Sequence, residues 1–106
     1  MALTKAGDVT LVPVPGHTPG QLAVVVRDGD HAVLLAGDAS YTEDALLRAV
    51  VDGVDPDEAA ERLTHERIRA YVADTPTVYL PAHDPETGAR LAARRTIGAA
   101  AEKAIA

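Results

Sequence analysis

Two histidines and one aspartate stand in short turn-like strings, and their side chains are of the types that bind metal ions. His17 lies in PGHTPG, Asp38 in AGDA and His83 in LPAHD, and each string ends or follows an apolar run. Neutral imidazoles and a carboxylate can together bind Zn²⁺ or Fe²⁺. From residue types alone, the three residues are either metal ligands or two histidines and an aspartate of ordinary turns.

Four runs rich in aliphatic and β-branched residues predict strands, at residues 9–14, 22–27, 31–36 and 77–80. Between the second and third runs, the Asp28-Gly29 pair is a strong signal for a tight hairpin turn. Three segments predict helices, from Thr42 to Val51, from Asp55 to about Ala73, and from Asp84 onward. The order β-β-β-α-α-β-α is that of a mixed α/β (α+β) sheet covered by helices.

This order predicts where the three candidate ligands lie relative to one another. Strands joined by short turns alternate in direction, whereas a connection through helices joins parallel neighbours. The first, third and fourth strands are therefore expected to run the same way. Because His17, Asp38 and His83 follow the ends of these strands, we expect them to share one rim of the sheet, where α/β folds carry ligand-binding residues.

The other histidines are assigned to ordinary structural positions. His31 opens the third strand beside the hairpin turn, at the opposite edge from the candidate ligands. His65 stands between Arg62 and Arg69 at helical spacing, which predicts a solvated helix face. Asp84 is expected to cap the terminal helix rather than to bind a metal. The buried face of the long helix is expected at Ala60, Leu63, Thr64, Ile68 and Tyr71.

Composition narrows the class of protein. Residues 1–106 are enough for one small domain, and 47% hydrophobic with 25% charged residues is the balance of a folded globular chain. The formal charge of −6 and the lack of a basic cluster argue against binding to nucleic acid. There is no cysteine to act as ligand or nucleophile, and no apolar run long enough to cross a membrane. Without a secretory signal, the expected location is cytoplasmic.

The strings PGHTPG, AGDA and LPAHD, in that order, resemble the last three metal-binding motifs of the metallo-β-lactamase superfamily. The stretch GDASYTEDALLRAVVDGVDPDEAAERL, followed by HDPE, is similar to the N-acyl homoserine lactonase branch of that superfamily. The resemblance implies half of an αββα sandwich and a zinc-dependent hydrolase of a small-molecule lactone or ester. It implies that His17 binds one Zn²⁺, that His83 binds a second, and that Asp38 bridges both, with Fe²⁺ or Mn²⁺ as alternative metals.

The chemistry implied by the resemblance is metal-assisted hydrolysis. A carboxylate between two cations about 3.5–4 Å apart holds a shared hydroxide ready to attack, and the metals polarise the lactone carbonyl. Tyr41 falls where the lactonases keep a tyrosine that hydrogen-bonds the substrate carbonyl or its oxyanion. Packing of Tyr41 against the short helix is the other interpretation. The GDASY string favours lactones over thioesters, and phosphodiesters are expected to need more positive charge near the site.

The sequence departs from the family pattern in two places. Gln21 replaces the second histidine of GHTPGH, which is not a ligand in the usual scheme, and is expected to affect packing or hydrogen bonding around the site. The upstream string HxHxDH, which supplies most of the ligands, has no counterpart. The chain is therefore expected to be the C-terminal half of the fold, to bind Zn²⁺ in the micromolar range or more weakly, and to be inactive alone. A non-catalytic metal-binding or assembly module derived from that fold is the alternative.

The sheet face that would meet the missing half is expected to be apolar, through Val24, Val26, Val33 and Leu35. A large exposed apolar surface tends to find a partner. We therefore expect the chain to associate with itself or to pair with a separately encoded N-terminal half.

Overall fold

The secondary structure follows the predicted order. In the computed structural model, residues 1–40, 42–48 and 58–97 are described. The strands are β1 (Val9–Pro13), β2 (Leu22–Asp28), β3 (His31–Gly37) and β4 (Thr77–Pro81), and the helices are α1 (Glu43–Leu47), α2 (Glu58–Asp74) and α3 (Thr87–Ala93). Within the described part of the chain, no helix combines the length and apolar character that a membrane span requires.

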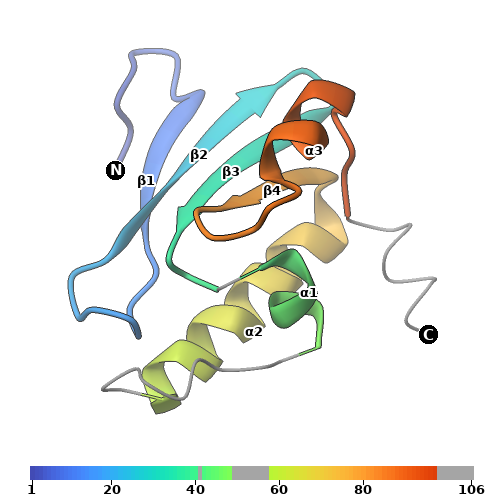
Figure 1. Ribbon diagram of the computed structural model, residues 1–106. Coiled ribbons are helices and arrows are strands. Elements are labelled where there is room, and N and C mark those ends of the chain that lie inside the picture. Colours follow the sequence, from blue (N-terminus) through green and yellow to red (C-terminus); the bar gives the residue numbers. More distant parts are fainter. Residues whose placement is uncertain (41, 49–57, 98–106) are drawn as a thin grey trace.

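The four strands form one mixed sheet in the order β1-β2-β3-β4 (Figure 1). β1–β2 and β2–β3 are antiparallel, and the tight turn between β2 and β3 pairs Asp28 with His31. β3–β4 is parallel because the chain returns through α1 and α2. The predicted strand directions are therefore confirmed, and β1, β3 and β4 end at the same rim of the sheet.

Helix α2 covers one face of this sheet, with α1 beside it, and α3 packs along the edge strand β4 (Figure 1). The core between α2 and the sheet is aliphatic apart from one tyrosine, with Val25, Leu34, Ile68, Val72 and Tyr79 among its members. The short helix α1 begins at the predicted residue, since the Thr42 side chain accepts a hydrogen bond from the Ala45 N–H. The predicted extension to Val51 and the predicted cap at Asp55 lie outside the described residues.

The buried face of α2 differs from the predicted one. Its buried residues are Glu61, Thr64, His65, Ile68 and Val72. Leu63, expected inside, is 46% exposed, and Tyr71 is only partly buried. The prediction was right for Thr64 and Ile68 but wrong for Leu63. It followed mainly apolar residues, whereas this helix buries three polar side chains beside the loops that carry the candidate ligands.

The second sheet face is apolar across all four strands. Residues paired across neighbouring strands point to the same side, so the register gathers ten apolar residues on this face: Val9, Leu11, Pro13, Leu22, Val24, Val26, Val33, Leu35, Val78 and Leu80. Val33, Val78 and Leu80 are buried, but Leu22 and Leu35 are 52% and 44% exposed. The predicted apolar face is confirmed, and we call these ten residues the open face.

Candidate metal centre

His17, Asp38 and His83 lie together at the rim where β1, β3 and β4 end. Nε2 of His17 is 3.6 Å from Oδ2 of Asp38, and Nε2 of His83 is 3.0 Å from Oδ1 of Asp38. All three side chains are partly exposed, so small molecules in solution can reach them. The carboxylate therefore lies between two imidazoles, with one imidazole at each of its oxygens.

The loop that carries His17 is held against helix α2. The hydroxyl of Thr64 donates to the carbonyl of Pro15 at 2.6 Å. Gly16 is buried with a φ of 146°, in a region that L residues rarely adopt, and a Cβ there would lie 2.6 Å from the Glu61 Cα. Only glycine allows this close approach of loop and helix backbones, and the approach fixes the position of His17.

Changing Gly16 to alanine is expected to lower the free energy of unfolding by about 2–3 kcal/mol, through backbone strain and overpacking against α2. Urea denaturation followed by circular dichroism measures this effect. Gly20→Ala in the same loop is the matched control, because a Cβ at Gly20 meets no atom within 4 Å. Equal denaturation midpoints for the two variants would show that the contact between Gly16 and Glu61 does not constrain the loop.

The loop that carries Asp38 is held from two sides. Gly37 adopts a positive φ of 57° at the irregular end of β3. With its amide oxygen facing the loop, Gln21 accepts hydrogen bonds from the N–H groups of Asp38 at 2.9 Å and Ala39 at 3.1 Å. Gln21 therefore ties the start of β2 to the Asp38 loop, and the effect of replacing the family's histidine here stays a prediction.

The other side of this loop is held by His65, for which the prediction of a solvated position was wrong. His65 is 1% exposed and its Nε2 donates to the carbonyl of Ala39 at 2.7 Å. Its neighbour one turn earlier, Glu61, is 2% exposed, with its Oε1 3.6 Å from that Nε2. Buried polar groups require hydrogen-bonding partners, and α2 supplies one to the backbone of the Asp38 loop. The sequence signal for this pair was the i,i+4 spacing of a carboxylate and an imidazole.

The predicted cap was wrong, since the N-cap of α3 is Glu86, and Asp84 has a different structural role. Its carboxylate accepts hydrogen bonds from the N–H of Glu86 at 2.8 Å and the N–H of Glu43 at 2.9 Å, and it pairs with Arg90 at 3.0 Å. The helix itself begins later than expected, at Thr87. Asp84 therefore joins the turn after His83 to the start of α1.

Arg90 completes this cluster and was missed in the sequence. Its buried guanidinium also contacts the Glu43 carboxylate at 2.8 Å and donates to the carbonyl of Tyr79 at 2.9 Å. Burial alone raises the pKa of Asp84, but the two backbone N–H groups and Arg90 outweigh it and lower that pKa below its usual value. Burial raises the pKa of Glu43 above its usual value, against the opposing effect of Arg90.

The remaining predicted residues lie apart from the rim or outside the described chain. His31 lies at the hairpin, where it contacts Asp28 at 3.6 Å and Asp30 at 3.1 Å, as expected for a residue beside a turn. Tyr41 lies outside the described residues. Its neighbour Ser40 is buried and hydrogen-bonds the Tyr79 hydroxyl at 2.8 Å.

The imidazole nitrogens and carboxylate oxygens at the rim are of the types that bind zinc, but too few of them face a common ion position. Among the described residues, no three His, Asp or Glu side chains surround a single ion position. Asp38 Oδ1 is buried and accepts no hydrogen bond of good geometry from the described residues, although the His83 nitrogen is near it. A buried carboxylate oxygen without such a bond fits a metal ligand. One imidazole and one carboxylate oxygen per ion are fewer than the three or four protein ligands that zinc usually has.

Comparison with known proteins shows the family of this chain. The family model described as the metallo-beta-lactamase superfamily matches residues 2–83. The chain, with its mixed sheet and its histidine–aspartate–histidine rim, therefore belongs to the metallo-β-lactamase superfamily. A comparison with curated proteins gave no match.

Solved structures with a similar fold include three enzymes that act on homoserine lactones or quench quorum sensing. An N-acyl homoserine lactone hydrolase with N-hexanoyl-L-homoserine bound at its catalytic metal centre is 25% identical, with a TM-score of 0.71 over 83% of this chain and 34% of its own. A quorum-quenching N-acyl homoserine lactone lactonase is 28% identical, with a TM-score of 0.66 over 74% and 33%. AidC, a dizinc quorum-quenching lactonase, is 20% identical, with a TM-score of 0.63 over 77% and 29%, and shows the fold alone. The chain thus spans about one third of the length of these neighbours.

Proposed function

We propose that this chain supplies one half of a zinc-dependent hydrolase that opens lactone rings. The observation that carries the proposal is the Asp38 carboxylate between two imidazoles, with His17 at one oxygen and His83 at the other. In this role, His17 binds one ion, His83 binds the other and Asp38 is shared. The similarity to lactone hydrolases supports lactones as the substrate class.

The residues of this chain would act by holding the metal-ligand atoms of His17, Asp38 and His83 in place. When bound, the metal ions would activate water and polarise the lactone carbonyl. Gln21 and His65 hold the Asp38 loop by its backbone, so the carboxylate oxygens stay free to face the two imidazoles. Tyr41 is proposed, from the resemblance, to donate its hydroxyl to the oxygen on which negative charge develops.

The same proposal assigns the open face to the other half of the sandwich. The rim offers two donors per ion, so the missing ligands must come from elsewhere. The exposed leucines of the open face belong to an apolar surface that another sheet can cover. We therefore propose that an N-terminal half carrying HxHxDH docks on this face. Self-association through the same face is the competing arrangement.

Mixing the chain with the N-terminal half of a homologous lactonase tests the proposal. We expect no hydrolysis of N-hexanoyl homoserine lactone by the chain alone, and zinc-dependent hydrolysis by the pair. His17→Ala should abolish the activity of the pair, whereas His31→Ala, at the far end of β3, should leave it unchanged. A pair that forms a stable complex and binds two zinc ions but does not open lactones would favour the non-catalytic module instead.

A further inference from the structure

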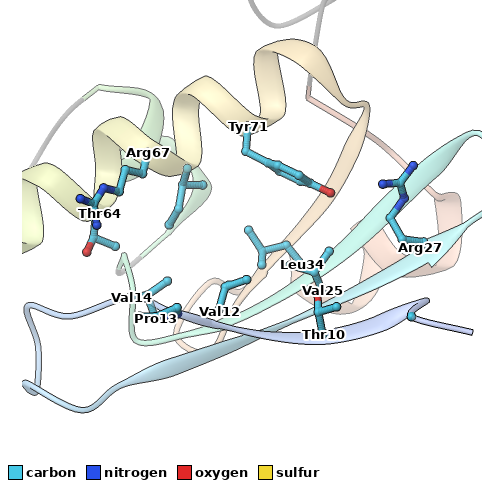
Figure 2. Close-up of a pocket in the computed structure, with 12 residues that line it drawn as sticks. Thr10, Val12, Pro13, Val14, Val25, Arg27, Leu34, Thr64, Arg67 and Tyr71 are labelled. Carbon is cyan, nitrogen blue, oxygen red and sulfur yellow. The ribbon is translucent and has the colours of Figure 1, made fainter. Parts of the chain in front are cut away.

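A cavity lies between helix α2 and the β1–β2 side of the sheet, and none of the candidate metal ligands lines it. Its volume is about 440 Å³, within the range of small-molecule sites. Its inner wall is aliphatic, formed by Val12, Val14, Val25, Leu34 and Ile68. Figure 2 shows Val12, Val25 and Leu34 on the sheet side, with Tyr71 reaching over them from α2.

This cavity is separate from the candidate metal centre. Gly16 packs against the backbone of Glu61, and the Thr64 hydroxyl donates to the carbonyl of Pro15. These contacts join α2 to the loop that carries His17, and His17, Asp38 and His83 are all absent from the lining of the cavity.

Two arginines mark the ends of the cavity. Arg67 lies beside Thr64 at one end, and Arg27 lies at the other end, toward which the Tyr71 hydroxyl points (Figure 2). Across residues 1–40, 42–48 and 58–97, neither guanidinium has an ion-pair or hydrogen-bond partner. Of the six other arginines, four are paired with carboxylates, namely Arg48, Arg62, Arg90 and Arg95, and Arg69 donates to the carbonyl of Leu46. In a chain of formal charge −6, two cations without carboxylate partners beside an apolar cavity favour an anionic ligand.

The two ends are not equivalent. At the Arg67 end, the Thr64 hydroxyl already donates to Pro15. At the Arg27 end, the Tyr71 hydroxyl and the side chain of Thr10 also line the cavity. A carboxylate there could accept bonds from a guanidinium and a phenol, and such charge-assisted bonds are stronger than neutral ones.

We propose that this cavity binds a medium-length aliphatic carboxylate, with its carboxylate at Arg27 and its hydrocarbon chain along Leu34 and Ile68. The eight residues from Thr64 to Tyr71 span about 10 Å of helix, which gives room for an extended chain of that kind. The inner wall offers few polar atoms, so sugars and nucleotides would lose more hydrogen bonds to water than they regain.

Titration of the ¹⁵N-labelled chain with sodium octanoate, followed by NMR, tests this site. We expect saturable shifts of amides in residues 10–14 and 64–71, and binding at least tenfold weaker for 1-octanol, which lacks the charge. Arg27→Gln should weaken octanoate binding at least tenfold and leave octanol binding unchanged. Arg62→Gln is the charge-matched control, because Arg62 lies on α2 outside the cavity lining and pairs with Glu58, and it should leave octanoate binding unchanged.

A cavity-filling variant gives an independent test. Val12→Phe should abolish binding of both octanoate and octanol, and circular dichroism reports whether it is folded. Equal affinities for octanoate and octanol, or an unchanged affinity in Arg27→Gln, would overturn the proposed role of the guanidinium. Shifts centred on Leu22 and Leu35 would overturn the site itself, because they would place the ligand on the open face.

Discussion

Changing Arg90 to methionine is expected to lower the free energy of unfolding by about 3–5 kcal/mol, because it leaves buried carboxylates without their cation. The Arg90 side chain is 6% exposed and contacts Asp84, which is 5% exposed, and Glu43, which is 20% exposed. The variant also removes the donor to the Tyr79 carbonyl. Such a loss is a large share of the stability of a small domain. Urea denaturation followed by circular dichroism measures it.

Arg95→Met provides the matched control for this prediction. The Arg95 side chain is 57% exposed and lies 3.9 Å from the Glu86 carboxylate, so its removal should cost less than about 1 kcal/mol. If both methionine variants lost the same small amount, the buried cluster would not be a main source of stability.

The pH dependence of unfolding gives a second readout of the Arg90 cluster. The pKa of Asp84 is lower in the folded chain than in the unfolded chain, so its contribution to stability is complete above about pH 4 and is lost as the pH falls through the folded value. The pKa of Glu43 is raised by burial, so its contribution has the opposite sign: it is present at acidic pH and lost as the pH rises through the folded value. In Arg90→Met both folded pKa values should rise, so the acid-induced loss of stability due to Asp84 should become smaller and end at a higher pH.

Changing Asp38 to asparagine is expected to weaken zinc binding at least about 100-fold in the complex with an N-terminal half, since the loss of groups that only orient ligands already costs about 10–100-fold. Asp38 faces both imidazoles, so this single change should weaken both ion sites. His17→Ala should weaken zinc binding at only one of the two sites. Calorimetric titration with Zn²⁺ measures affinity and stoichiometry, and lactone hydrolysis should be lost in parallel.

The asparagine variant should still fold. The hydrogen bonds that hold this loop use backbone groups of Asp38 and Ala39 rather than the carboxylate. Asp44→Asn, on the exposed surface of α1, removes the same charge away from the rim and should leave zinc binding unchanged. If Asp38→Asn retained one ion at full affinity, Asp38 would not be shared between two ions.

Much of the fold was predictable because its signals are local. The Asp28-Gly29 turn requires β2 and β3 to be antiparallel, and the helices before β4 make β3 and β4 parallel neighbours. The strands are apolar at consecutive positions, and successive side chains point to opposite faces, so the sequence predicts that both faces of the sheet are apolar. These rules also predicted that His17, Asp38 and His83 meet at one rim, although their roles as ligands stay predictions.

The sequence by itself therefore determined the order of the elements, the directions of the strands and the rim on which the candidate ligands lie. The tertiary structure alone decided which polar residues are buried, and it corrected the prediction for His65 and added Arg90. A buried polar side chain is tolerated only where a partner meets it. The partners of these two residues, the carbonyls of Ala39 and Tyr79, come from other elements of the fold, so no pattern within one helix could reveal them.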